Sequence, residues 1–213
     1  MVTANTSKNQ ILPVEKTAFS IQLFTYTIFH YHVTEDKRDT MNQFMPSQKI
    51  LHWGSALIIL GLFILGVWMR TLDYYHSWYV SAPTLHKSWG VLLTGIIIFR
   101  LIWRFRYSMP NALDSHKKWE VTTAYLTHRA MLLLTLVIIA TGYLISTADD
   151  KGIEVFGLFE LPTIINAFEQ QEDISGFIHK WAAYALIALV VLHSAGALKH
   201  HFVDKDSTLK RML

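Results

Sequence analysis

Four histidines lie within the most apolar parts of this 213-residue chain: His52, His86, His179 and His193. Imidazole is the commonest metal ligand among side chains, and an ionisable residue inside an apolar segment is by default a candidate functional group. Each histidine taken singly is equally well explained by a hydrogen bond to a backbone carbonyl or by a place at a membrane surface. Their spacing and their order along the chain must therefore decide between these interpretations.

His179 and His193 belong to the same apolar stretch and are 14 residues apart. In an α-helix this separation amounts to about 1400°, roughly 40° short of four full turns, with a rise of about 21 Å. The two imidazoles therefore project from one face of the helix at well-separated depths. This spacing predicts two ligand sites, one near each surface of a membrane.

The elements that position these residues are four apolar stretches close to the ~20 residues that span a bilayer as a helix. One such stretch is also typical of a buried core helix, but four of them, flanked by charges, Trp or Tyr, are typical of a membrane protein. Only 16% of the residues are charged, whereas an average soluble domain has about 25%. We expect an all-α membrane protein with a four-helix transmembrane bundle. The stretches cover residues 52–69, 85–103, 125–145 and 177–198.

Lys and Arg side chains are distributed unevenly between the two sides of the expected bundle. The segment up to residue 49, the loop over residues 100–129 and the tail from residue 199 carry 15 of them, and the other two loops carry 4. Basic residues near the ends of membrane helices tend to remain in the cytoplasm. The sequence therefore predicts cytoplasmic termini (N-in/C-in) in a multi-pass protein of a bacterial inner membrane.

This topology sorts the four histidines into an outer pair, His86 and His179, and an inner pair, His52 and His193. Two imidazoles at matched depth suit a six-coordinate haem b, because zinc or copper usually needs a third or fourth ligand. The chain has no cysteine, which excludes thiolate metal sites and c-type haem. We expect two non-covalent haem b groups, whose closed coordination favours electron transfer over oxygen binding. A haem-free transporter component would require this pairing by depth to be a coincidence.

Five segments of the sequence resemble the bacterial cytochrome b561 family of four-helix dihaem membrane proteins. The resemblance covers about residues 48–213 and rests on KILHW, LHKSWG, RLIWRFRYSMP, YLTHR and HKWAAYALIALVVLHSAGALKHHFVDKDSTLKRML. In that family the residues that match the four histidines are haem ligands. Some members are superoxide:ubiquinone oxidoreductases, and others transfer electrons without a known donor. The resemblance therefore implies an oxidoreductase or electron-transfer protein that works between an outer donor and the ubiquinone pool.

Two lysines, Lys87 and Lys180, directly follow the outer histidines. One interpretation places them at the lipid interface, or against haem propionates. The other is that they attract a small anion such as superoxide to the outer site. The loop over residues 147–180 is acidic, so any such attraction must be local. We therefore treat Lys87 and Lys180 as candidate catalytic residues.

The inner side is the expected site of ubiquinone reduction, which consumes two protons as well as two electrons. His200 and His201 follow the fourth apolar stretch, and either imidazole could donate protons there. The alternative is that both lie among lipid headgroups without a specific role. Additional cofactor-binding residues expected around the inner site are His128, Arg129, Trp53 and Arg100.

Within this set, His128 could hydrogen-bond a haem propionate or the quinone, since it has no partner on a facing helix for ligation. Arg129 is expected to anchor its helix or to pair with a propionate. The remaining histidines, outside the four stretches, are expected to be surface residues: His30, His32, His76 and His116.

An alternative function is that of a cytochrome b membrane-anchor subunit, which accepts electrons from a periplasmic dehydrogenase or hydrogenase. The acidic loop over residues 147–180 is compatible with a docking surface for such a partner. Anchors of this kind usually have a longer or a fifth helix, for which the sequence gives no indication.

The first 44 residues do not belong to the four-helix pattern. We expect residues 1–44 to be a disordered or surface-lying arm, and residues 45–213 to be the cytochrome domain. Met41 and Met45 precede the first stretch, so natural translation could begin there.

Overall fold

The computed structural model describes residues 43–107, 110–164 and 168–213. Met41, His30 and His32, on which the sequence-based predictions for the N-terminal arm depend, lie outside these residues. The fold is therefore described for the part of the chain that follows the arm.

Four helices in the described residues are long and apolar enough to cross a membrane. The predicted all-α membrane bundle is therefore confirmed. Each helix is longer than the apolar stretch within it, because backbone groups remain hydrogen-bonded when the helix continues for another turn or more into the polar interface. The helices are α2 (Pro46–Met69), α3 (Ser81–Arg106), α4 (Lys118–Ser146) and α5 (Gln171–Phe202).

Local sequence explains where two of these helices begin. Pro46 occupies the first turn of α2, where its missing N–H costs no hydrogen bond, and the Gln48 side chain accepts the N–H of Met45 at 3.0 Å. At the start of α4, a carboxylate oxygen of Glu120 accepts the N–H of Lys117 at 2.9 Å. This negative charge is also favourable near the positive end of the helix dipole.

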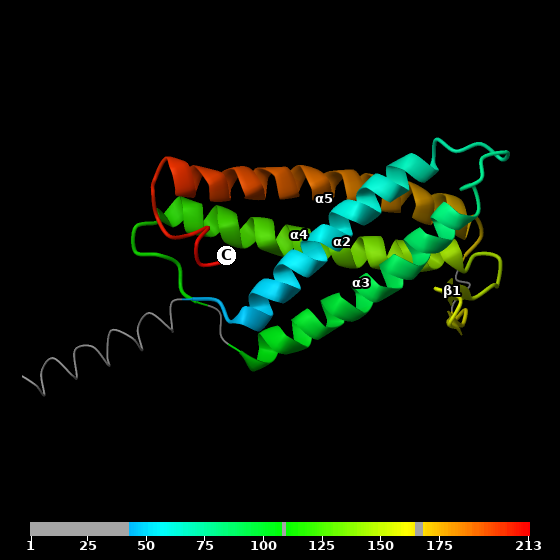
Figure 1. The fold of residues 1–213 in the computed structure, drawn as a ribbon, viewed down its shortest axis with the longest axis horizontal. Coiled ribbons are helices and arrows are strands. Elements are labelled where there is room, and N and C mark those ends of the chain that lie inside the picture. Colours follow the sequence, from blue (N-terminus) through cyan, green and yellow to red (C-terminus); the bar gives the residue numbers. More distant parts are fainter. Residues whose placement is uncertain (1–42, 108–109, 165–167) are drawn as a thin grey trace, which may run out of the picture. The chain divides into compact units, whose positions relative to one another are not determined.

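The helices pack as two close pairs. Helix α2 lies beside α3, and α4 lies beside α5 (Figure 1). Most of the residues buried in these helices are small, as is usual where membrane helices approach closely, although Leu93, Ile97 and Leu186 are also buried. The hydroxyl groups of three buried residues donate to backbone carbonyls of the same helix: Ser55 to Leu51, Ser88 to Thr84 and Thr141 to Val137.

A small antiparallel hairpin lies in the acidic loop between α4 and α5. Strand β1 (Ile153–Val155) pairs with β2 (Phe159–Leu161), and Phe156 and Gly157 adopt positive φ in the turn. The buried side chains of Ile153 and Val155 face α3, and the Ser88 hydroxyl accepts the N–H of Phe156 at 3.0 Å. The sequence did not predict these strands, since three-residue strands carry too little of the period-two pattern to be recognised.

The bundle therefore has two different ends (Figure 1). The hairpin end carries β1 and β2, together with the start of α3 and the end of α4. The tail end carries the loop between α3 and α4 and the C-terminal tail, residues 203–213. On the predicted topology, the hairpin end is the outer one and the tail end the cytoplasmic one.

Candidate functional site

One pair of histidines meets near the hairpin end of the bundle. His86, in the second turn of α3, faces His179 on α5, and their ring centroids are 6.2 Å apart with an interplanar angle of 65°. These are the two residues that the sequence assigned to the outer site. The structure therefore brings together two side chains that are separated by 93 positions.

A second pair meets near the tail end. His52, in the second turn of α2, faces His193 on α5, with ring centroids 6.4 Å apart and an interplanar angle of 66°. Helix α5 thus contributes one histidine to each pair, as the 14-residue spacing predicts. The partners come from α2 at one end and from α3 at the other.

The separation within each pair fits a metal ion bound between two imidazoles. Two imidazoles on opposite sides of one ion, each bonded at ~2.0 Å, have ring centres about 6.4 Å apart. The observed separations are 6.2 and 6.4 Å. Both pairs could therefore hold a haem iron, and no thiolate competes for it because the chain contains no cysteine.

A backbone contact orients the ring of His179. Its Nδ1 lies 3.0 Å from the carbonyl oxygen of Ile138 and 3.3 Å from the hydroxyl of Thr141, both on α4. A carbonyl can only accept, so Nδ1 carries the proton and Nε2 keeps its lone pair for a metal. Such a bond from the second ring nitrogen is the usual support of a metal-bound histidine.

His86 has a matching environment on α2. Its Nδ1 is buried without a hydrogen-bond partner among the described residues, and the backbone of Leu62 lies close to the ring. A methyl group added at Gly66 would lie 3.1 Å from Cε1 of His86, and one added at Gly142 would lie 3.2 Å from Cε1 of His179. Each glycine follows the corresponding backbone neighbour, Leu62 or Ile138, by four residues. The backbone of α2 therefore contacts His86 in the same way as the backbone of α4 contacts His179. Both histidines fit the role of a haem ligand.

Two other predicted residues lie close to the tail-end pair. The ring of His128 on α4 lies 5.0 Å from that of His193. Trp53 packs edge-on against His52 at 5.5 Å and donates its indole N–H to the carbonyl of Met212 in the tail at 2.9 Å. The C-terminal tail thus reaches the immediate neighbourhood of the His52 ring.

Arg100 is connected to the same pair through Ser55. The guanidinium of Arg100 donates to the Ser55 hydroxyl, which in turn lies 2.7 Å from the Leu51 carbonyl and 3.0 Å from that of His52. Arg129, in contrast, is exposed and lies over the Tyr125 ring on its own helix at 5.1 Å. The structure therefore places Arg100 near the tail-end histidine pair. The position of Arg129 is compatible with the predicted role of an anchor for its helix.

The two candidate lysines flank the hairpin-end pair in sequence, and both are half-buried. The ammonium of Lys180 lies over the Trp181 ring at 5.4 Å. This contact is typical of a residue at the lipid interface, where an aromatic ring and a cation lie together. Of the two, Lys87 therefore remains the better candidate for attracting an anion.

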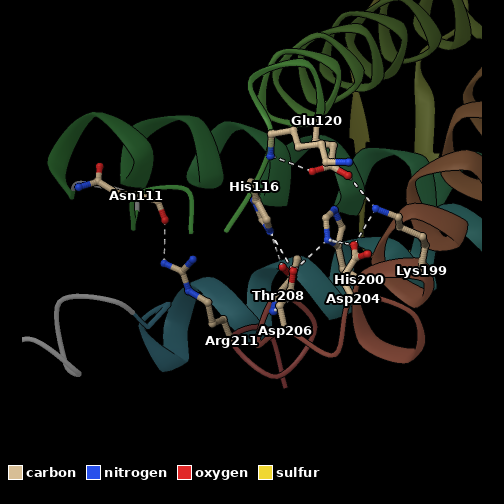
Figure 2. A network of polar contacts seen from close by, with 10 residues as sticks. Asn111, His116, Glu120, Lys199, His200, Asp204, Asp206, Thr208 and Arg211 are labelled. Atoms are coloured by element: carbon tan, nitrogen blue, oxygen red, sulfur yellow. Dashed lines mark hydrogen bonds and ion pairs between the residues drawn. The ribbon is translucent and has the colours of Figure 1, made fainter. Parts of the chain in front are cut away.

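His200 and His201 have different surroundings. The Nδ1 of His200 lies 2.9 Å from carboxylates of both Asp204 and Asp206, in a network that also includes His116 (Figure 2). The Nδ1 of His201 is buried without a partner among the described residues. The expectation that His116 is an ordinary surface residue is wrong, because it is half-buried and bonded to the tail.

Sequence reasoning also missed Trp103 on α3. Its indole N–H is buried and has no hydrogen-bond acceptor among the described residues. Such a donor is costly to bury unless something accepts from it. A tryptophan in the last turn of an apolar stretch looks like an interfacial anchor, so only the three-dimensional environment distinguishes it.

Comparison with known proteins identifies the class to which this fold and these histidine pairs belong. The family described as Prokaryotic cytochrome b561 matches residues 43–213. Cytochrome b561 homolog 2 of Escherichia coli (strain K12) is 48% identical over 162 residues, which cover 76% of this chain and 86% of that protein. Cytochrome b561 homolog 1 of the same organism is 25% identical over 173 residues, covering 81% and 98%. The probable superoxide oxidase CybB of Yersinia pestis is 27% identical over 139 residues, covering 65% and 77%.

The molecule is thus a multi-pass membrane haem protein of electron transport. More narrowly, the chain belongs to the prokaryotic cytochrome b561 family, whose cofactor is b-type haem. The sequence-based family assignment is confirmed.

Proposed function

We propose that this protein holds two b haems and carries electrons from a donor at the hairpin end to ubiquinone at the tail end, across a bacterial inner membrane with both termini in the cytoplasm. His86 and His179 would ligate one haem, and His52 and His193 the other. The observation that carries the proposal is the pair of histidines on α5, each of which faces an imidazole of another helix at 6.2 or 6.4 Å.

A haem between two imidazoles supplies one-electron redox chemistry. The contribution of the chain is to fix the two rings of each pair, to place a proton on Nδ1 of His179, and to separate the sites along α5. Their separation of about 21 Å follows from the helical rise. The positive charge of Arg100 lies near the tail-end site, where it favours the reduced state of a haem.

Superoxide is the proposed donor. It is a small anion, and Lys87 provides positive charge directly beside His86. Two superoxide anions, each oxidised to dioxygen by loss of one electron, supply the two electrons needed to reduce one ubiquinone. The similarity to a probable superoxide oxidase supports this choice of donor.

Reduction of ubiquinone to ubiquinol also takes up two protons at the tail end. His201 offers a buried Nδ1 that has no partner among the described residues, and Trp103 offers a buried indole N–H. Either group could hydrogen-bond a quinone oxygen, and His201 could transfer a proton to the quinone. His200 is engaged with Asp204 and Asp206 instead, so His201 is the preferred donor of the two.

The experiment that tests this function mixes the purified oxidised protein with potassium superoxide, with and without a soluble ubiquinone. We expect haem reduction without quinone, and ubiquinol formation with it. Heat-denatured protein controls for spontaneous disproportionation. Haem that stays oxidised under superoxide would contradict the proposed donor.

A second candidate function is the membrane anchor of a periplasmic oxidoreductase. The hairpin favours it, because Leu158 and Phe159 are 79% and 53% exposed and acidic residues surround them in the same loop. Co-purification of a redox subunit that reduces the haem, together with no response to superoxide, would favour this function.

A further inference from the structure

A polar cluster at the tail end lies outside both histidine pairs. It joins the loop between α3 and α4 to the end of α5 and to the C-terminal tail (Figure 2). The Nε2 of His116 lies 3.2 Å from Oδ2 of Asp206, and Nδ1 of His200 lies 2.9 Å from the same oxygen. The loop residue His116 and the C-terminal residues His200 and Asp206, which are about 90 positions away in sequence, therefore direct nitrogen and oxygen ligands to one point.

These three atoms have the spacing of a metal-binding site. They lie within 4.8 Å of one another, and ligands bound tetrahedrally to one zinc ion at ~2.0 Å lie about 3.3 Å apart. The side chains are only 14%, 15% and 10% exposed for His116, His200 and Asp206. A cavity of about 250 Å³ adjoins them, so an ion has both room and access.

The charges of the cluster also favour a divalent cation. Glu120, Asp204 and Asp206 carry three carboxylates, and Lys199 supplies one ammonium, 2.7 Å from Glu120 and 2.6 Å from Asp204. The N–H of Thr208 donates to Oδ1 of Asp206 at 2.8 Å, which holds the carboxylate with its Oδ2 toward the two imidazoles. The carboxylates outnumber the ammonium by two, a balance that favours a divalent cation.

We propose that His116, His200 and Asp206 bind one divalent transition-metal ion of the zinc class, and the adjoining cavity leaves room for a water molecule as the fourth ligand. Imidazole ligands select zinc and related ions over magnesium and calcium, which prefer oxygen. The neighbouring group of Glu120, His200 and Asp204 is a poorer site, because the Lys199 ammonium already contacts both of its carboxylates.

The ion would fasten the tail onto the loop between α3 and α4. In the same tail, Arg211 donates to the carbonyl of Asn111 in that loop at 3.0 Å, and the carbonyl of Met212 accepts from Trp53 at 2.9 Å. Because Trp53 packs on His52, metal binding would stabilise the surroundings of the tail-end pair.

The test uses full-length protein purified without a polyhistidine tag, treated with EDTA, dialysed, and titrated with zinc chloride in excess magnesium. Bound zinc is measured by mass spectrometry of the metal, and the protein by amino-acid analysis. The wild type should bind one zinc ion per chain, and His116→Ala and Asp206→Asn should bind only background amounts. His76→Ala is the matched control, since His76 is exposed at the other end of the bundle, and it should bind as the wild type does.

Trypsin cleavage after Lys205 or Lys210 provides a second measurement on the same samples. Zinc should slow cleavage of the tail at least about tenfold in the wild type and should leave the rate unchanged in His116→Ala. An unchanged haem spectrum of each variant shows that the bundle has folded. The proposal is overturned if the wild type binds no more zinc than the two variants, or if bound zinc does not protect the tail.

Discussion

The Nδ1 of His179 donates a hydrogen bond to the carbonyl oxygen of Ile138 at 3.0 Å. Four residues further along α4, Gly142 leaves room for the edge of the same imidazole. The hydrogen bond fixes the tautomer of His179, and the absence of a side chain at Gly142 lets the ring lie close to α4. The equivalent contacts of His86 involve Leu62 and Gly66 on α2.

Gly142→Ala and Gly66→Ala should weaken haem binding at the hairpin-end pair by about tenfold, since support of this kind is typically worth 10- to 100-fold in metal affinity. The added methyl group would lie 3.2 or 3.1 Å from Cε1 of the histidine, so the ring must shift. Gly61→Ala is the control, because a Cβ there meets nothing within 4 Å. Haem titration of the three variants measures the effect, and equal affinities would contradict the seating role of the glycines.

Arg100→Gln should lower the midpoint potential of the tail-end haem by tens of millivolts, because a nearby positive charge stabilises the reduced form. The potential of the other haem should be unchanged. Arg129→Gln is the matched control, since Arg129 is exposed and lies over Tyr125. Redox titration followed in the visible spectrum measures both potentials; a shift of the same size in both variants would argue against a local effect of Arg100.

Lys87→Gln should lower kcat/KM for superoxide several-fold at low ionic strength, with a smaller difference at high salt, because electrostatic attraction is screened. Lys151→Gln removes a charge from the exposed loop before β1 and serves as the control. Stopped-flow haem reduction gives the rates. A loss in Lys87→Gln that does not depend on salt would indicate that Lys87 acts by another route.

His201→Gln should slow the transfer of electrons to ubiquinone by about 100-fold, the scale of a lost general acid. Haem reduction by superoxide should keep its wild-type rate, because that step occurs at the other end. The two steps are separated by reducing the haem first and then adding the quinone. If ubiquinol forms at the wild-type rate, His201 is not the proton donor.

The sequence was sufficient to predict the four membrane helices and the way the four histidines pair. Both follow from regular geometry: an apolar run of the length of a bilayer, and a 14-residue spacing that keeps His179 and His193 on one face. The structure brings His86 to His179 and His52 to His193, although ligation itself remains a prediction.

The hairpin and the tail cluster could not be predicted in this way. Strands β1 and β2 have three residues each, and what stabilises them includes the contact with Ser88 on another element. His116 and Asp206 are 90 positions apart, so no local pattern connects them. Features that depend on contacts between distant segments become visible only in the folded chain.

The most direct test of the central claim is the haem content of His179→Ala and His193→Ala, measured as pyridine haemochrome per chain and by redox titration. The wild type should contain two b haems. Each variant should retain one, and the two variants should retain haems of different potential, because α5 contributes one ligand to each site. A wild type with a single haem, or two variants that lose the same haem, would contradict the two-site account.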